Sequence, residues 1–282
     1  MGNLTIFTEF VFMNTSSSRE LLLFLVIYLG ALTGNLVTIT VIVTDPHLHS
    51  QLYFFTGNSS LIDLCCISVT VPKFIVNSLA GNALISLLAC GAQISLFLLF
   101  GSTELAFLVV MSYDRYVAIC HPLHYGLAIT PCLCPQAPGG SWASGLVYSS
   151  IHTGSIFRFP FTGSNVNYQY FCHVPQILRI SSSDVQFSEF IIIVISVAIR
   201  YINIFSIVFS MNSMEACNKV LSTCTPQLAV LLIFTISGII AALGPNADNL
   251  FTGMFYPMVP PVINPLIYDI RNREINTAIR RM

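Results

Sequence analysis

Long apolar stretches, separated by short polar segments, run along almost the whole of this chain. A helix needs about 20 mostly apolar residues to cross the ~30 Å hydrocarbon core of a bilayer. Seven stretches meet this requirement: residues 21–43, 53–76, 89–111, 141–159, 190–209, 216–243 and 250–268. The fourth is the weakest, because it contains several glycines together with His152 and Arg158. None shows the two-residue alternation of a membrane β-barrel. The pattern therefore predicts an all-α membrane protein with seven transmembrane helices.

The composition supports the same class. Of the 282 residues, 55% are hydrophobic and only 8% are charged, whereas about 25% are charged in a soluble domain. The net charge of −1 provides no basic surface for nucleic acid. The seven stretches and their short loops fill the chain. We therefore expect residues 1–282 to form one membrane domain, with an outer tail at 1–20, a helical bundle at 21–268 and an inner tail at 269–282.

The basic residues indicate the orientation, because Lys and Arg collect near the cytoplasmic ends of spans. If the N-terminus is outside, four basic residues lie near the outer face and seven near the inner face. Those seven are Arg115, Arg200, Lys219, Arg271, Arg273, Arg280 and Arg281. The N-terminal tail also carries two N-glycosylation triplets, which begin at Asn3 and Asn14. We expect an extracellular N-terminus and a cytoplasmic C-terminus.

The inner tail has a helical pattern of its own. Residues recur at helical spacing in two rows, Ile270, Glu274 and Ala278 in one and Ile275, Ile279 and Met282 in the other, and the arginines of the tail point in other directions. This pattern predicts a short amphipathic helix that lies on the inner leaflet. A frayed tail is the alternative.

Two acidic residues fall inside predicted spans, where ionisable groups are costly and are therefore candidates for function. Asp63 lies midway along the second span and Glu104 midway along the third. One interpretation is a shared polar pocket between helices, in which the acids are protonated or hold a cation and water. The other is a hydrogen-bonded network that only fixes helix packing. The residues alone favour neither, and they do not decide whether a sodium ion occupies the pocket.

The third span ends at the predicted inner face with Asp114-Arg115-Tyr116. Opposite charges at a helix end are typical of interfacial anchoring. The alternative is a switch, in which Asp114 holds Arg115 in one state and releases it toward a partner in another.

The seventh span closes with residues 264–268, Asn-Pro-Leu-Ile-Tyr. Pro265 removes a backbone donor and bends the helix. Asn264 can then bond the freed carbonyl or reach another helix. A kinked helix end with no further role is the alternative.

The remaining candidate chemistry is that of the nine cysteines. Most of them lie in or near spans, where they fit apolar filler, and the pair Cys132 and Cys134 has no partner at zinc-ligand spacing. Cys90 and Cys172 fall on the outer, oxidising side, where a disulfide can form. The chain contains no HExxH, GxSxG or Walker-type motif. We expect no enzyme, no metal site and no cofactor.

The motifs together resemble a known family. Residues 111–125, Met-Ser-Tyr-Asp-Arg-Tyr-Val-Ala-Ile-Cys-His-Pro-Leu-His-Tyr, are similar to the most characteristic signature of the olfactory receptors, a family of rhodopsin-like G-protein-coupled receptors. Gly34-Asn35 and residues 53–55, 61–63, 219–224 and 260–268 match other marks of that family. The resemblance covers almost the whole chain.

This resemblance implies a plasma-membrane receptor that binds a small, mostly hydrophobic organic ligand and activates a heterotrimeric G protein of the stimulatory class. It also implies a Cys90–Cys172 disulfide, since Cys90 stands in the family's register relative to Arg115. The implied switch residues are Asp114, Arg115, Tyr116, Asn264, Pro265 and Tyr268. Those of the polar intramembrane pocket are Asn35, Asp63 and Glu104. The expected ligand-binding residues, four on one face of the third helix and two on the sixth, are Phe97, Leu98, Gly101, Ser102, Thr235 and Ile239. Helix packing is the alternative for each of these six.

The chain also departs from the family pattern, at Gln51, Thr162, Ser182, Arg200, Gln227 and Thr235. Thr162 and Ser182 stand where the family has two more cysteines, so a second disulfide of the outer loop is not expected. Arg200 places a charge in the inner half of the fifth span. A degenerate receptor with poor signalling is therefore one alternative function. A transporter or channel is another, although an odd number of spans without internal repeats argues against it.

Overall fold

The structure is a computed structural model. It describes residues 9–12, 18–48, 51–80, 84–120, 133–158, 166–167, 172, 174–179, 258–266 and 273–281, together with single residues between 187 and 236. The statements below concern this part of the chain.

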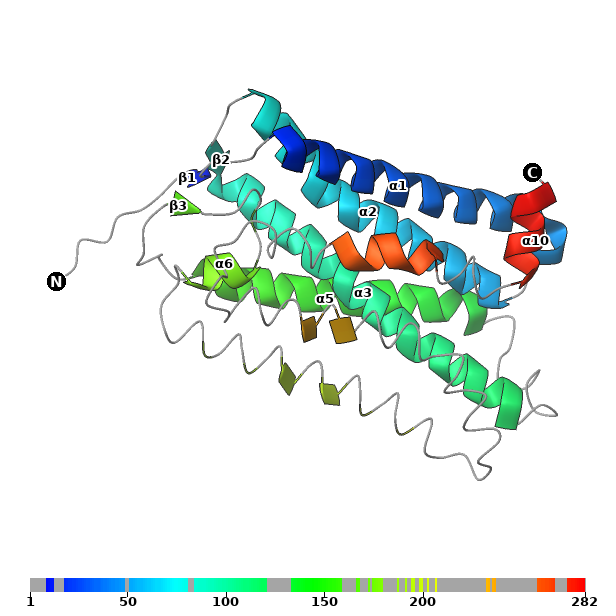
Figure 1. Ribbon diagram of the computed structural model, residues 1–282. Helices are drawn as coiled ribbons and strands as arrows, with labels where there is room; N and C mark the ends of the chain where they lie inside the picture. Colours follow the sequence, from blue (N-terminus) through cyan, green and yellow to red (C-terminus); the bar gives the residue numbers. More distant parts are fainter. Residues whose placement is uncertain are drawn as a thin grey trace.

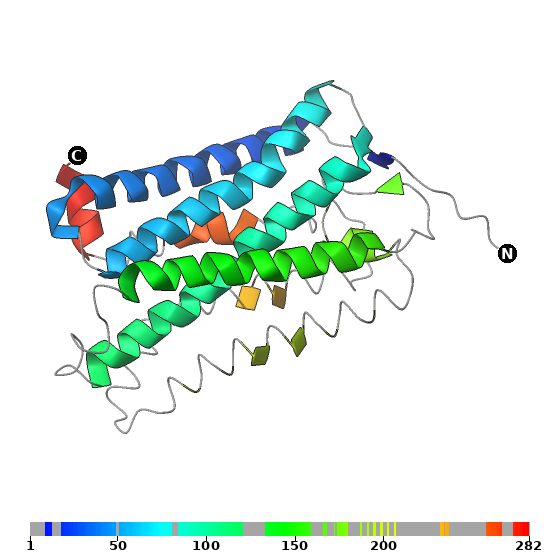
Figure 2. The ribbon, with the colours of Figure 1, turned by 180° about the vertical axis from the view of Figure 1, so that it is seen from behind.

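Four long helices form the described bundle: α1 (Ser18–Thr44), α2 (Gln51–Ala80), α3 (Leu87–Cys120) and α5 (Leu133–Arg158). Figures 1 and 2 show them side by side, with α3 in contact with both α2 and α5, and with the helical residues 258–266 alongside. The first three predicted spans lie within α1, α2 and α3, and α5 covers the fourth up to Arg158. The fifth and sixth, apart from single residues, lie outside the described residues.

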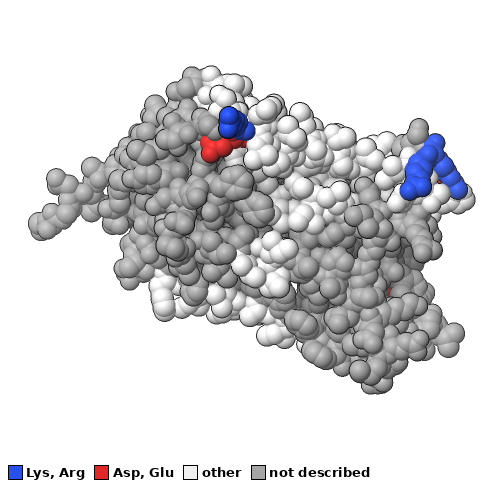
Figure 3. Space-filling view, viewed as in Figure 1, with Lys and Arg blue, Asp and Glu red and all other residues white. Residues whose placement is uncertain are grey.

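Three of these helices are long and apolar enough to cross a membrane, over Ser18–Thr44, Tyr53–Leu79 and Leu87–Met111. Their outward side chains are apolar and exposed; Leu22, Leu79, Leu88 and Val43 each expose more than 60% of their surface. Exposed apolar surface on this scale suits a lipid environment. In the view of Figure 3, white, uncharged side chains lie between two groups of coloured, charged ones.

A small sheet, which the apolar pattern did not predict, covers one end of the bundle. It consists of β1 (Glu9–Phe12), β2 (Leu84–Ser86) and β3 (Val166–Asn167) in the order β2-β1-β3. The central strand, β1, pairs antiparallel with β2 and parallel with β3. The N-terminal tail is thereby joined to the turn before α3 and to the chain beyond α5.

Beneath this sheet lies a buried cluster, which we call the outer cluster; the terms outer end, for the end with the sheet, and inner end, for the opposite one, follow the predicted orientation. The outer cluster consists of Ile85, Cys90, Ile94, Ile156, Cys172, Val174 and Ile177. The last two belong to the short helix α6 (Val174–Arg179). Ser86 accepts a hydrogen bond from the backbone N–H of Ala89 (3.2 Å), as an N-cap residue does. It therefore marks the place where β2 ends and α3 begins.

At the opposite end, the 3₁₀ turn η1 (Pro46–Leu48) and helix α10 (Arg273–Arg281) pack against the last turns of α1. Ile275 and Ala278 are buried against Val41 and Leu48, whereas Arg280 and Arg281 are exposed. Figure 1 shows α10 lying across the end of α1. The tail is helical over these residues, and its position on a leaflet stays a prediction.

Candidate functional site

The two acids predicted to share a pocket meet at a single side chain. Asn264, among the helical residues 258–266, donates from Nδ2 to Asp63 Oδ2 (3.0 Å), Asp63 Oδ1 (3.3 Å) and Glu104 Oε1 (2.9 Å). Asp63 belongs to α2 and Glu104 to α3. Asp63 is fully buried, and Asn264 exposes only 4% of its surface. One amide group therefore joins the neighbouring helices α2 and α3 to a helix that lies 160 residues or more further along the chain.

At this cluster, the carboxyl oxygens outnumber the amide hydrogens that can bond them. An Asn amide carries two hydrogens, and here three carboxyl oxygens lie within 3.3 Å of it. Two ionised acids this close together and away from water would repel one another at high cost. A proton on one acid or a cation between them would remove this repulsion. Both interpretations drawn from the sequence are compatible with this geometry.

Asn35 of α1 binds the same proline-containing helix one turn earlier. It is fully buried, and its Nδ2 donates to Ala31 O (3.0 Å) and Pro261 O (2.9 Å). Pro265 has no N–H for the carbonyl four residues before it, which is that of Pro261. Asn35 therefore satisfies the carbonyl that Pro265 leaves free, whereas Asn264 reaches other helices. This settles the alternative that the sequence left open for Asn264.

Gly34 explains how α1 comes so close to the proline. A Cβ atom at Gly34 would lie 3.2 Å from Cβ of Pro265. This separation is shorter than an ordinary van der Waals contact, so a larger residue at position 34 would require the proline to move. The Gly34-Asn35 pair therefore acts as a unit: the glycine admits the proline ring, and the asparagine bonds the freed carbonyl.

The predicted switch at the inner end of α3 is described only in part. Asp114 is buried, with 6% of its surface exposed. The side chains of Arg115 and Tyr116, and the whole of Tyr268, lie outside the described residues. Their switching role stays a prediction.

Two of the expected ligand-binding residues contact different helices. Phe97 is buried against Cys66 of α2, whereas Ser102 Oγ donates to Leu99 O (3.1 Å) and to Gly145 O of α5 (3.4 Å). A helix turns by about 100° per residue, so five residues separate their directions by about 140°. That Phe97 and Ser102 line one ligand site stays a prediction.

The other expected ligand-binding residues are less constrained. Leu98 packs at the edge of the outer cluster. Gly101 has open space where a Cβ atom would stand. Thr235 is half-buried, and Ile239 lies outside the described residues. Ligand binding at these positions stays a prediction.

The implied disulfide is present. Cys90 and Cys172 are bonded with their Cα atoms 5.3 Å apart, and both are buried. The bond connects the first turn of α3 to the chain just before α6. Of the remaining described cysteines, Cys65 and Cys66 are free.

In the described part of the chain, no group of three or more His, Cys, Asp or Glu side chains is arranged to hold a metal ion. Asn3 and Asn14, the predicted glycosylation sites, lie outside the described residues. So do the departures at Thr162, Ser182, Arg200 and Gln227.

Helices α3 and α5 meet through small residues that the sequence analysis did not single out. A Cβ atom at Gly145 would collide with the Thr103 hydroxyl and stand 3.1 Å from Leu99 O. One turn away, the Ser95 and Ser149 hydroxyls are 3.0 Å apart, and Ser149 Oγ donates to Ser95 O. The available signal was the spacing of Gly145 and Ser149, since small residues four apart allow membrane helices to pack closely.

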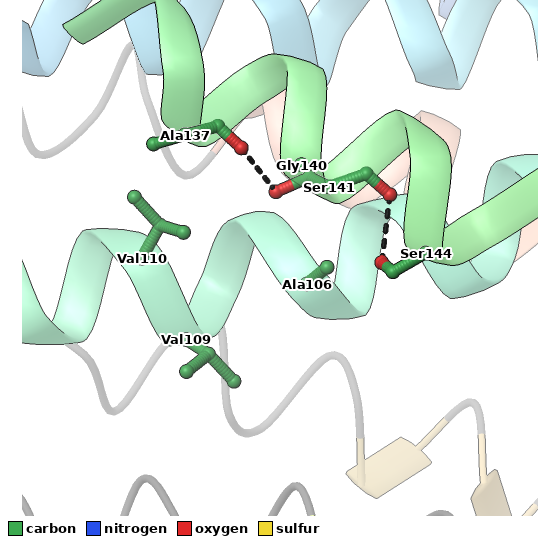
Figure 4. Close-up of a pocket in the computed structure, with 7 residues that line it drawn as sticks. All are labelled: Ala106, Val109, Val110, Ala137, Gly140, Ser141 and Ser144. Carbon is green, nitrogen blue, oxygen red and sulfur yellow. Dashed lines mark hydrogen bonds between the residues drawn. The ribbon is translucent and has the colours of Figure 1, made fainter. Parts of the chain in front are cut away.

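An open groove runs between the same two helices toward the inner half of the bundle, with a volume of about 370 Å³. Its walls are Ala106, Val109, Val110, Ala137, Gly140, Ser141 and Ser144, as Figure 4 shows. Ser141 donates to Ala137 O (2.9 Å) and Ser144 to Ser141 O (2.8 Å). Both hydroxyl hydrogens are therefore used within α5, and in the groove these two side chains offer only hydrogen-bond acceptors.

The fold is that of the rhodopsin-like receptors. The crystal structure of squid rhodopsin matches with a TM-score of 0.67 and 15% sequence identity, over 93% of this chain and 84% of that one.

The sequence comparisons identify the family. A family model described as Olfactory receptor matches residues 24–282. Human olfactory receptor 14I1 is 45% identical over 100% of this chain and 97% of its own length, and human olfactory receptor 14A16 is 42% identical over 99% and 96%. The chain belongs to the olfactory receptor family. The predicted family is thereby confirmed, and with it an odorant-type receptor of the plasma membrane that crosses the bilayer several times and is not an enzyme.

Proposed function

We propose that this chain is an odorant receptor that binds a small, mostly hydrophobic organic molecule within its helical bundle and activates a heterotrimeric G protein of the stimulatory class. Full-length similarity to human olfactory receptors supports the receptor class. The observation that carries the mechanism is the contact of Asn264 with both Asp63 and Glu104.

This contact suits a switch because it is readily changed. A movement of the kinked helix at residues 258–266 by one hydrogen-bond length would separate Asn264 from α2 or from α3. The helix is deformable there, since it contains Pro260, Pro261 and Pro265. A ligand that shifts this helix therefore changes the balance between the two acids, and a protein with two such states responds to whichever ligand prefers one of them.

The G protein is proposed to bind at the inner face, where Arg115 is released from Asp114. In this orientation the N-terminus with Asn3 and Asn14 is extracellular, seven helices cross the membrane, and α10 lies on the cytoplasmic leaflet. The exposed Arg280 and Arg281 beside the buried Ile275 and Ala278 support that position for α10, because basic side chains are attracted to anionic lipid headgroups.

The odorant is proposed to lie between the third, fifth, sixth and seventh helices, against Phe97, Leu98 and Gly101, with Thr235 and Ile239 opposite. The open space at Gly101 leaves room there for a ligand of modest size. An apolar cavity with few polar groups selects such a ligand mainly through its shape and apolar surface.

The test is a second-messenger assay in cells that express an N-terminally tagged receptor together with a stimulatory G protein. Antibody binding to the tag on intact cells measures surface level and orientation. Arg115→Ala should abolish the response to an odorant that activates the unmutated receptor, with surface level unchanged. Arg158→Ala is the matched control, because Arg158 is an exposed residue in the last turn of α5, and it should leave the response intact. A surface-exposed receptor that ignores a broad odorant panel would contradict the proposal and favour a degenerate receptor.

A further inference from the structure

A single buried carboxamide joins three parts of the outer end. Gln93 lies on α3 three residues after Cys90, on the same face of the helix, and exposes 6% of its surface. Its Nε2 donates to Val69 O of α2 (2.9 Å), and its Oε1 accepts from the backbone N–H of Cys172 (3.0 Å). Both ends of the carboxamide are therefore used, each by a different segment.

On the α2 side, the contact lies in the turn that precedes a proline. Val69 stands three residues before Pro72, which is inside the helix. Proline has no N–H for the carbonyl four residues before it, which is that of Ser68, and its ring crowds the preceding turn. Gln93 donates to the next carbonyl of that turn, Val69 O. The position of α2 at this turn is thereby tied to α3.

On the other side, Gln93 accepts a hydrogen bond from Cys172, which is already attached to α3 by its disulfide to Cys90. The disulfide to Cys90 places Cys172 near α3, but it leaves the peptide plane of Cys172 free to rotate about the side-chain bonds. The hydrogen bond from its N–H to Gln93 fixes that plane. Because Cys172 exposes only 1% of its surface, no water is at hand to replace the acceptor, and an unmade bond there would be costly.

We propose that Gln93 is a positioning residue, which sets the orientation of the chain at Cys172 relative to α2 and α3. The segment that Gln93 positions in this way is proposed to be the outer wall of the odorant cavity. The geometry points to this role because Phe97, an expected cavity residue, lies four residues further along α3, about one turn inward on the same face. The part that concerns the odorant rests on the proposed function, whereas the part that concerns the loop does not.

The loop is tested on purified full-length receptor without any odorant. Gln93→Met keeps the length of the side chain and removes both hydrogen bonds. Gln136→Met is the matched control, because Gln136 is exposed on α5. We expect hydrogen exchange at the Cys172 amide to be at least about tenfold faster in Gln93→Met, as for the opening of a local contact, and reduction of the disulfide by a phosphine to be faster too. Exchange and reduction equal to those of the unmutated receptor would overturn the proposal.

Gln93→Glu provides the conservative variant. A neutral carboxyl group can replace the carboxamide, since its hydroxyl donates and its carbonyl oxygen accepts, but a carboxylate has no hydrogen for Val69 O. A free glutamate loses its proton near about pH 4.3. Relative to the unmutated receptor at the same pH, reduction should therefore be normal near about pH 4, where the carboxyl is largely neutral, and fast near about pH 8, where it is ionised. Normal reduction at the higher pH, in a variant whose new carboxylate band is present in the infrared spectrum, would show that the donor half of the carboxamide has no role and would overturn the link to α2. This variant also decides the matter if Gln93→Met fails to fold.

The cavity wall is tested with a panel of straight-chain aliphatic alcohols and aldehydes. For the most potent member of the panel, Gln93→Met should raise the half-maximal concentration about tenfold, a factor that corresponds to 1.4 kcal/mol, with the maximal response and surface level unchanged. If exchange and reduction at Cys172 become faster while the half-maximal concentration stays unchanged, the proposal that this segment forms the cavity wall is overturned. An unmutated receptor that responds to no member of the panel would count against the proposed function alone, because exchange and reduction still decide the role of Gln93.

Discussion

Helix α3 makes polar contacts on two sides in the interior of the bundle, and they differ in construction. Toward α5, the contact is between small residues: Gly145 lies against Thr103, and the hydroxyls of Ser95 and Ser149 bond to each other. Toward α2 and residues 258–266, the contact is between larger groups, since Asn264 bridges Asp63 and Glu104. In the α3–α5 contact, each of these hydroxyls has a hydrogen-bond partner. At Asn264, three carboxyl oxygens share the two hydrogens of one amide group.

This difference separates a fixed interface from a changeable one. Close packing of small residues has a single good arrangement, because any shift opens a void or a collision. A cluster that needs a proton or a cation has several arrangements of similar energy, and a ligand can select among them. We therefore expect substitutions at the α3–α5 interface to change folding and those at the Asn264 cluster to change signalling.

The largest effect is expected from Gly145→Val. The new side chain would have to occupy space held by Thr103 and by the Leu99 carbonyl, and overpacking of this kind costs about 3 kcal/mol. We expect most of the receptor to be retained inside the cell, with little antibody binding at the surface.

The matched control is Gly154→Val, since Gly154 lies on the same helix with nothing within 4 Å of its Cβ position. Its surface level should be close to that of the unmutated receptor. Equal retention of both variants would mean that valine is harmful anywhere in α5, and the tight contact at Gly145 would not be the cause.

The next effect is expected from Asn264→Leu. The substitution removes the donor that Asp63 and Glu104 share, and leaving buried acceptors unsatisfied costs about 2 kcal/mol. We expect the odorant response to be reduced about tenfold or more, which is the factor that 1.4 kcal/mol produces, while the surface level falls less than in Gly145→Val. A normal response in Asn264→Leu would contradict the assignment of this cluster to the switch.

The sequence predicts part of this comparison well. Each of the first four spans coincides with a described helix, the fourth up to Arg158, because bilayer thickness requires about 20 apolar residues whatever the tertiary structure. Asp63 and Glu104 are recognisable as candidates, because an acid in a span is costly. The meeting of these two at Asn264 depends on tertiary packing, which spacing along one chain does not give.

Other contacts were missed for identifiable reasons. Gly145 lies in the least apolar span, where the sequence pattern treats its glycines only as residues that weaken a helix. Gln93 lies near a helix end, where one polar side chain is unremarkable in sequence, and its role depends on Val69 and Cys172. The strands of the outer sheet have two to four residues each, too few for a period-2 pattern to be recognised.

A smaller effect should distinguish a cation between Asp63 and Glu104 from a proton on one of the two acids. If a cation lies between Asp63 and Glu104, replacing about 150 mM N-methyl-D-glucamine chloride by sodium chloride should raise the thermal midpoint of the purified receptor by about 2–4 °C, as about 1 kcal/mol would. Glu104→Gln removes one of the two charges and should reduce that difference by at least half. A midpoint that does not depend on sodium in either form would instead assign a proton to the pair.

The smallest effect is expected from Ser149→Ala. The substitution removes the hydrogen bonds of Ser149 Oγ to Ser95 and leaves the close approach at Gly145 intact. A hydrogen bond between membrane helices contributes about 0.6 kcal/mol on average, so the thermal midpoint should fall by only one or two degrees and the odorant dose–response curve should be unchanged. The fixed interface would then depend on shape more than on its hydroxyls. A shifted dose–response curve would mean that the α3–α5 contact also takes part in signalling, and the division between a fixed and a changeable side of α3 would have to be abandoned.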